Sequence, residues 1–550
     1  RDLTLQYRDA TLDYKDLAQQ AVIDAQAVAA GNVFDDSATG ALGWSSQKIS
    51  DELALVTSAD FEFGETIGAG VNVALGSDGK IYPISETPMT LAQSNPASPV
   101  SGADVYWLTG KIFGNTIIVT YRYGAVYIRA GVITGDSISW GTAVNIDGYT
   151  VSNLPDIAYH ATDNTYIVTR RGSLANYNQE ARSFTVSGNT ISLSPTKLYL
   201  GINPFTHGSF LHFFPSLNKT IAMGITYMNG AFTIAEISSS GGVLTLGDKE
   251  NLSSGVQGGN TQNVFAVDDD LDIVFCAGEG YEYNVGNRGI ALSSFGVLEN
   301  SGRFDLLSTA KIKDYVTSGG QNPYYVMTTV DKKRRRVYVC YAMNGSAQAR
   351  IEIVSAEYDE KGTITKINPP TTYKVKPAGA TYYAYPKVLG FNPEGGNLIY
   401  GASGTYSTNY AELSSSYSSE DGSVVNLTEN LVIASGSGTK ELNHSKIIYD
   451  EGSKRNLLLS QNDTARTGVF DARFINGGHS NCIDFIGVTQ EGALAGETSG
   501  VSLKGTVLEG AYTASTKYFV DKNGNTTTQD TGVPLGKGLG TGKMIMTGGV

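Results

Sequence analysis

A repeated unit between residues 104 and 475 constrains the fold more than any other feature of the chain. Each unit has an apolar strand, a polar turn, a second and very apolar strand, a polar loop, a third strand and usually a tight turn into a fourth. Equivalent apolar residues of the second strand lie at positions 118, 167, 221, 273, 337, 398 and 457, which are 49 to 64 residues apart. Four strands at this spacing are typical of β-propeller blades.

A single blade cannot bury both faces of its sheet, whereas blades arranged radially cover one another. We therefore expect a mainly β fold with a seven-bladed β-propeller. Six or eight blades remain open, because the first and last units are the least regular. The unit is too long for a β-helix coil, and a β-sandwich does not repeat seven times. The last unit lacks a fourth strand, and residues 90–108 are the candidate to supply it.

The segments outside the repeat differ from it in character. Residues 1–60 are predicted to form a short helical, coiled-coil-like stem, because Asp13 to Ala30 contains neither Gly nor Pro and carries a loose apolar stripe. So small a stripe does not stabilise a lone helix, so the stem should pack against copies of itself. The predicted divisions are residues 1–60 (stem), 61–103 (first half of a small β-module and linker), 104–475 (propeller) and 476–550 (C-terminal β-module).

Three short segments resemble bacteriophage tail fibres. Trp44-Ser45-Ser46-Gln47-Lys48-Ile49 matches a segment that recurs in fibre stems, and residues 485–525 match a β-module common near fibre C-termini. The upstream partner of that module matches Gly68–Pro83. The resemblance covers about a fifth of the chain. It implies a homotrimeric virion protein whose two module halves form one small β-domain, with the propeller inserted between them.

Composition argues against nucleic-acid and membrane functions. The net charge is −13, and a phosphate-binding groove needs clustered Lys and Arg. The one basic run, Lys332–Arg336, is interpreted as a solvated strand edge. No run of 18 apolar residues occurs, so we expect no membrane insertion. The cysteines Cys276, Cys340 and Cys482 form no disulfide framework, and the first two are expected to be small buried hydrophobes.

The sequence contains no recognisable catalytic set. The histidines show no HxH or HExxH spacing, and His207 and His212 are interpreted as loop residues. Asp268-Asp269-Asp270 is interpreted as an acidic turn and not as a calcium site. We therefore expect no enzyme activity, no cofactor and no metal.

Loops that contain tyrosine indicate a function more clearly than any candidate catalytic residue does. The loops between second and third strands combine Tyr, Asn, Ser and Gly, a composition that suits adaptable recognition surfaces. The other interpretation is that many of these tyrosines fill half-buried strand ends. The candidate receptor-binding residues are Tyr177, Tyr281, Tyr283, Asn284, Tyr406 and Tyr410.

The leading hypothesis is a tail-fibre protein of the virion that attaches the virus to a host-surface receptor, either a glycan or an outer-membrane protein, and that contacts other tail proteins. One alternative is a glycan depolymerase or glycosidase on the same scaffold, which needs two carboxylates in one pocket. Another alternative is a purely structural virion protein or a cell-surface adhesin.

Overall fold

The computed structural model divides the chain into two compact units, Thr87–His479 and a second unit made of Arg1–Glu86 with Ser480–Val550. Nearly all of the predicted stem, residues 1–60, lies outside the described residues. The structure describes residues 58–75, 80–87, 89–97, 106–123, 125–147, 155–171, 179–201, 209–225, 231–253, 256–257, 264–281, 288–298, 303–313, 322–344, 350–373, 384–393, 396–404, 410–418, 424–426, 431–435, 445–462, 469–477, 479–480, 485–490, 492–503, 507–509, 512–513, 516–520, 523–528, 533–540 and 543–546.

The described residues of the larger unit form seven successive antiparallel sheets, which we number as blades 1 to 7. Blade 1 has β6 (Tyr106–Phe113), β7 (Thr116–Tyr123), β8 (Ala125–Thr134), β9 (Ser137–Trp140) and β10 (Val144–Asp147). Blade 2 has β11 (Asp156–His160), β12 (Thr165–Arg171), β13 (Gln179–Ser187) and β14 (Thr190–Tyr199), with the short 3-10 helix η1 (Ala161–Asp163) after β11. Blade 3 has β15 (Ser209–Phe214), β16 (Lys219–Ile225), β17 (Ala231–Ser240) and β18 (Val243–Ser253).

The remaining blades repeat this meander. Blade 4 has β19 (Val256–Gln257), β20 (Phe265–Asp268), β21 (Ile273–Tyr281), β22 (Arg288–Val297) and β23 (Phe304–Lys313). Blade 5 has β24 (Asn322–Asp331), β25 (Arg336–Asn344), β26 (Arg350–Tyr358), β27 (Ile364–Ile367) and β28 (Thr371–Tyr373). Blade 6 has β29 (Ala384–Asn392), β30 (Asn397–Gly404), β31 (Tyr410–Ser418), β32 (Val424–Asn426) and β33 (Leu431–Ser435). Blade 7 has β34 (Lys446–Asp450), β35 (Arg455–Asn462), β36 (Val469–Asn476) and β5 (Thr90–Leu91).

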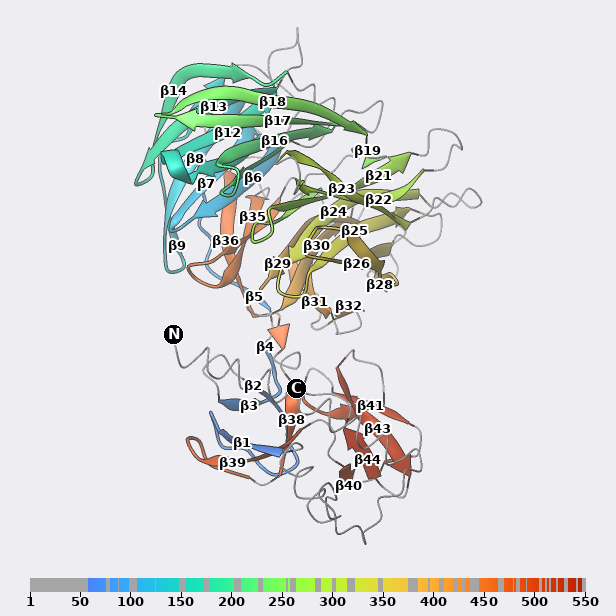
Figure 1. Ribbon diagram of the computed structural model, residues 1–550. Helices are drawn as coiled ribbons and strands as arrows, with labels where there is room; N and C mark the ends of the chain where they lie inside the picture. The colour runs from blue at the N-terminus through green and yellow to red at the C-terminus, as the bar shows by residue number, and fades with distance from the viewer. Residues whose placement is uncertain are drawn as a thin grey trace, which may run out of the picture. The chain divides into compact units, whose positions relative to one another are not determined.

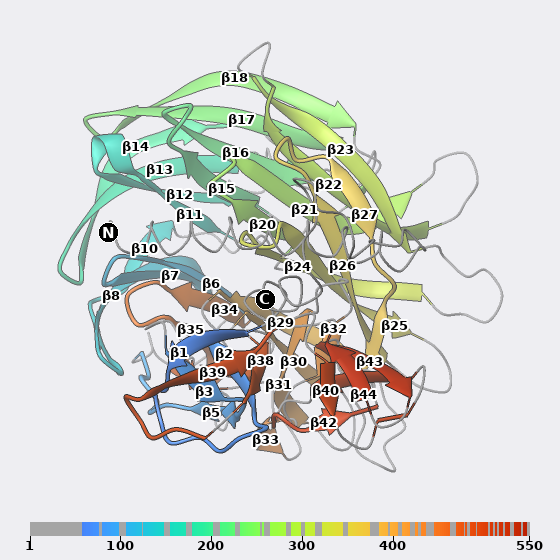
Figure 2. The same cartoon turned by 60° about the horizontal axis from the view of Figure 1, so that its bottom comes forward.

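The sheets are arranged radially, as Figures 1 and 2 show, so the prediction of a β-propeller is confirmed. The first strand of each blade lies at the centre, and the outer strands such as β14, β18 and β23 lie at the rim. We call the inner ring of first strands the hub. It consists of β6, β11, β15, β20, β24, β29 and β34.

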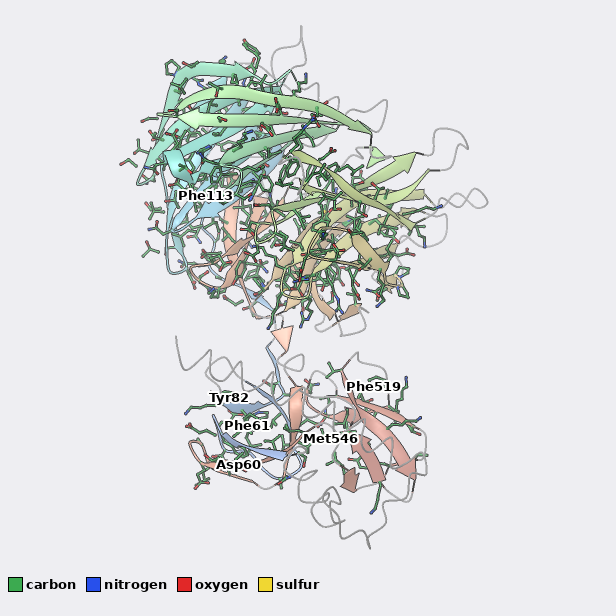
Figure 3. All side chains as sticks on the ribbon, in the orientation of Figure 1. Asp60, Phe61, Tyr82, Phe113, Phe519 and Met546 are labelled. Carbon is green, nitrogen blue, oxygen red and sulfur yellow. The ribbon has the colours of Figure 1, made fainter. Side chains whose placement is uncertain are left out.

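Buried apolar clusters join each blade to the next. In blade 1, Ile117 and Val119 face the cluster shared with blade 7, and Ile118 between them faces the cluster shared with blade 2. Successive strand residues point to opposite faces, and both faces of an inner strand are covered. The second strands are therefore apolar throughout rather than alternating, as the sequence predicted. Figure 3 shows side chains between the sheets throughout this unit.

Blade 7 is completed by a segment from the other end of the repeat. Leu91 pairs with Ile475 of β36, and the backbone amides of Ala92 and Ala97 donate to the carbonyls of Phe474 and Phe470. This fourth strand therefore comes from the first part of the range, 90–108, that the sequence offered for it. The side chain of Asn95 fastens the segment, because it accepts from the amide of Ile138 (3.0 Å) in blade 1 and donates to the carbonyl of Asp136 (2.9 Å).

The smaller unit joins two distant parts of the chain in one sheet. Its order is β1 (Ser58–Glu62), β39 (Thr498–Ser502), β38 (Phe485–Thr489), β2 (Asn72–Leu75) and β3 (Ile81–Pro83). A second sheet contains β40 (Val507–Glu509), β44 (Lys543–Met546), β43 (Pro534–Gly540), β41 (Lys517–Val520) and β42 (Thr526–Thr527). Asn72 of β2 pairs with Val488 of β38, and its side-chain amide donates to the carbonyl of Gly524 (2.8 Å). The short strands β4 (Glu86–Thr87) and β37 (His479–Ser480) pair in a two-stranded sheet.

Candidate functional site

The candidate tyrosines fall at or beyond the edge of what the structure describes. Tyr281 is the last residue of β21 and Tyr410 is the first residue of β31, so both lie where second and third strands are connected. Their side chains are outside the described part. Tyr177, Tyr283, Asn284 and Tyr406 lie outside the described residues altogether. Their role in receptor binding remains a prediction.

The two ends of each blade carry different connections. At one end, tight turns join the first strand to the second and the third to the fourth, and we call it the turn end. At the other, which we call the loop end, the second strand leads into the third and one blade leads into the next. Tyr281 and Tyr410 lie at the loop end. The first residues of the hub strands lie there too, since Asp156 at the start of β11 pairs with Thr169 near the end of β12.

Four hub residues form a polar cluster near the loop end. Lys446 of blade 7 donates from Nζ to Oγ1 of Thr109 in blade 1 (3.0 Å). Lys111 of the same strand as Thr109 donates to the carbonyl oxygen of Leu211 in blade 3 (2.6 Å) and lies 3.3 Å from Oδ2 of Asp156 in blade 2. The cluster therefore links four consecutive blades around the hub.

The strand register explains why these residues meet. Lys446 pairs with Leu459, Thr109 with Thr120 and Asp156 with Thr169. Each partner lies two residues after the repeat positions 457, 118 and 167. The three residues therefore occupy the same level in blades 7, 1 and 2, and they become neighbours when the hub brings the first strands together.

Asp156 is held by its surroundings. Its Oδ1 accepts from the amide of Ile157 (2.8 Å), and its Oδ2 accepts from the amide of Leu211 (2.8 Å) and from Lys111. The side chain of Asp156 is 11% exposed, and that of Lys111 is 25% exposed. With three donors on its two oxygens, Asp156 is a structural anchor with little capacity left for another cation.

Burial lowers the pKa of two hub lysines, Lys446 and Lys387. It lowers the pKa of Lys446 to about 8, and the nearby charge of Lys111 lowers it further while Asp156 raises it. Burial also lowers the pKa of Lys387 in β29 to about 8, and its ammonium lies 5.2 Å from the centre of the Tyr325 ring. His212 is neutral, because burial and the charges of Lys111 and Lys332 lower its pKa to about 3.

His212 corrects an expectation from the sequence. It lies inside β15, paired with Ile221, and not in a loop. Its ring packs at 4.9 Å against Phe214 on the same strand. An imidazole among aromatic rings can occupy a strand interior as a neutral apolar body, which residue type alone did not reveal. His207 lies outside the described residues.

The buried carboxylates of the third strands have close partners. Glu180 forms an ion pair with Arg170, and Glu352 accepts from the hydroxyl of Tyr341 (2.8 Å) and lies 3.2 Å from Lys313. In a glycosidase one of two facing carboxyls must be free to give a proton. These glutamates are occupied in structural pairs and do not resemble such an acid.

The basic run is a turn, and its interpretation as a strand edge was wrong. Residues 332–335 connect β24 and β25, and β25 is paired on both sides, by β24 and β26. The tight turn places Arg335 in the left-handed region (φ 52°). The cations are neutralised locally by the ion pairs Lys332–Asp269, Arg334–Asp331 and Arg335–Glu360.

The acidic run Asp268–Asp270 starts at the last residue of β20 and continues into the turn that follows it. Asp268 is buried and accepts from the hydroxyl of Tyr358 (2.7 Å) in the next blade. Within the described ranges no group of three or more His, Cys, Asp or Glu is placed to hold a metal ion. Cys276 and Cys340 are buried and free, as expected, and Cys482 lies outside the described residues. Among the helices of the described residues, none is long and apolar enough to span a membrane.

Sequence reasoning missed the hub lysines, although a signal was present. Three apolar first strands carry one lysine each, in Lys111-Ile112-Phe113, Lys387-Val388-Leu389 and Lys446-Ile447-Ile448. A lysine inside an apolar strand is unusual, because burying an ammonium is costly without a partner.

Comparisons with known proteins give distant likenesses to solved structures. No protein-family model matches the chain, and no curated protein matches it in sequence. A solved protein from Lactobacillus plantarum is 15% identical (TM-score 0.35) and covers 66% of this chain and 90% of its own. The periplasmic gluconolactonase of Pseudomonas aeruginosa is 12% identical (TM-score 0.39; 73% and 99% covered), and the WD40 domain of SCAP from fission yeast is 11% identical (TM-score 0.35; 71% and 98% covered). These likenesses are distant and carry no conclusion about what this chain does.

Proposed function

We propose that the protein is a receptor-binding tail-fibre protein of a bacteriophage, in which a seven-bladed propeller grips the host surface and the smaller unit belongs to the fibre. The observation that carries the proposal is the sheet β1-β39-β38-β2-β3. It joins residues 72–83 to residues 485–502, the two segments that resemble the halves of a tail-fibre module. The propeller lies between them in the sequence, as an inserted binding unit would.

Two further features support a binding role. The tyrosine-containing loops of the loop end have the composition of a recognition surface. Tyr281 ends β21 and Tyr410 begins β31 at that end of the sheets. The hub cluster lies at the same end. The receptor is therefore proposed to approach the loop end, while the turn end holds the blades together.

The proposal is tested by binding and by oligomeric state. The labelled full chain should bind saturably to cells of at least one strain in a panel of bacteria, with competition from unlabelled protein. Light scattering should give a trimer, because fibre stems wind three chains together. A stable monomer of the full chain, or no saturable binding to any strain, would contradict the proposal.

A glycan depolymerase on the same scaffold is the alternative, and one experiment separates the two. The full chain is incubated with surface polysaccharide purified from a strain that it binds, and new reducing ends are measured over time. The binding proposal predicts none above the level of a heat-denatured control. Release of oligosaccharides would establish the depolymerase and overturn the binder-only account.

A further inference from the structure

We propose that the hub binds an anionic oxygen group, a carboxylate or phosphate of the receptor, at the loop end through Lys446, with Thr109 and Lys111 beside it. That the group belongs to a receptor rests on the proposed function. The binding of the anion itself does not, and it is tested separately.

The first argument is the hydrogen-bonding capacity of Lys446. An ammonium has three N–H donors and no acceptor. Within the described part of the chain, Lys446 uses one of them, toward Thr109 Oγ1 at 3.0 Å. Lys111 has both a carbonyl and a carboxylate as partners. Within that part, two donors of Lys446 and one of Lys111 therefore remain for a ligand.

The second argument is the local charge. Two lysines, Lys111 and Lys446, share one carboxylate, Asp156, which already accepts from Lys111 and from two backbone amides. His212 is neutral and adds no charge. The hub cluster is thus positive in a chain whose net charge is −13. Such a site attracts an anion.

The third argument is the protonation of Lys446. Burial lowers its pKa to about 8 because the charged form lacks sufficient compensation. The charges acting on it are Asp156 of β11, which raises the pKa, and Lys111 of β6, which lowers it. An anion placed against Nζ would stabilise the charged form and raise the pKa. Binding should therefore take up protons near pH 8 and weaken above it.

Titration calorimetry of the full chain tests this, with glucuronate and inorganic phosphate as anionic probes and glucose as the neutral probe, at constant ionic strength. We expect an anionic probe to bind at pH 7 and glucose not to bind. At pH 9.5 the affinity should fall by more than about tenfold, since most of Lys446 is then neutral. The heat should also depend on the ionisation enthalpy of the buffer near pH 8. The probe that binds better identifies the carboxylate or the phosphate as the preferred group.

Variants locate the site. Lys446→Gln should lower the affinity for the anionic probe by at least tenfold, and Thr109→Val should lower it by a few-fold. The matched control is Lys333→Gln, which removes the same charge from an exposed residue at the turn end and should leave the affinity unchanged. Equal affinity in wild type and Lys446→Gln, or no binding of either anion to wild type, would overturn the inference. The pH series uses the wild-type chain, so it decides the matter even if a variant fails to fold.

The inference and the proposed function fail in different ways. If wild type and Lys446→Gln bind a bacterial strain equally well, the hub does not contact the receptor, and the receptor-binding proposal stands. If wild type binds glucuronate or phosphate and no strain at all, the anion site stands and the proposed function fails.

Discussion

The turn end and the loop end of the blades differ in how many partners their charged side chains have. At the turn end, Asp163 of blade 2 accepts from the hydroxyl of Ser239 and from the amides of Gly241 (2.7 Å) and Gly242 (3.0 Å) in blade 3. At the loop end, Lys446 has a single hydroxyl as its described partner. The charged group at the turn end, Asp163, therefore has several partners from the next blade. The charged group at the loop end, Lys446, still has N–H donors for a ligand near the proposed receptor face.

Several turn-end contacts share one pattern. In the blade pairs 2–3, 4–5 and 7–1, residues at or next to the turn between third and fourth strands reach residues at or next to the turn between first and second strands of the preceding blade. Arg455 of blade 7 contacts Asp136 of blade 1 at 2.6 Å, and Asp268 of blade 4 contacts Tyr358 of blade 5. Because these contacts cross between blades, they add to the stability of the closed ring as well as to that of each sheet.

The largest stability effect should come from the closing segment. Asn95→Ala removes the acceptor of the Ile138 amide and the donor to Asp136 in a residue that is 8% exposed. A buried donor left without a partner is costly, so the free energy of unfolding should fall by about 2–3 kcal/mol. Urea unfolding measures this. The control Asn189→Ala, at an exposed turn contact of 3.4 Å, should change it by less than about 0.5 kcal/mol. Equal effects would show that the closing contacts are not special.

A smaller loss is expected at the contact between blades 2 and 3. The hydroxyl of Ser239 and the amides of Gly241 and Gly242 lower the pKa of Asp163 to about 2. Because this folded-state pKa lies below the unfolded value, the contribution is present above about pH 4 and is lost as the pH falls toward 2. Asp163→Asn should cost about 1 kcal/mol at pH 7, with the difference from wild type shrinking at low pH. A difference that is independent of pH would contradict this.

At the loop end we expect a substitution to raise the free energy of unfolding and not to lower it. Lys446→Met should stabilise the protein at pH 7 by up to about 1 kcal/mol, because a half-buried ammonium with a lowered pKa is replaced by an apolar chain. The folded-state pKa lies below the unfolded value, so wild-type stability should rise with pH from about 8 to about 10.5. Thermal unfolding measured across this pH range should show a smaller rise of the midpoint temperature with pH for the variant than for wild type. Destabilisation by this change would mean that Lys446 has a structural role.

The smallest effect belongs to the exposed ion pair Lys332–Asp269 at the turn end, whose side chains are 39% and 49% exposed. Solvent screens such a pair, so Lys332→Gln should alter the free energy of unfolding by less than about 0.5 kcal/mol. A loss comparable to that of Asn95→Ala would show that exposed charge, and not buried hydrogen bonding, holds the turn end together.

The repeat predicted the propeller because its signal is local. Residues such as Ile118, Ile167 and Ile221 lie in apolar second strands that are visible within a short window, and all three are fully buried. The hub cluster is not local. Thr109 and Lys446 are 337 residues apart in the sequence and meet only because blade 7 closes against blade 1. The basic run was misplaced for a related reason, because the pairing of β25 on both sides depends on strands outside the run.

The measurement that tests the central claim most directly is the binding of the labelled full chain to intact bacteria, with Lys446→Gln and Lys333→Gln compared in parallel on the same panel. The account predicts saturable, competable binding to at least one strain by wild type and Lys333→Gln, with clearly weaker binding by Lys446→Gln. A folded wild-type protein that binds no strain would contradict the account.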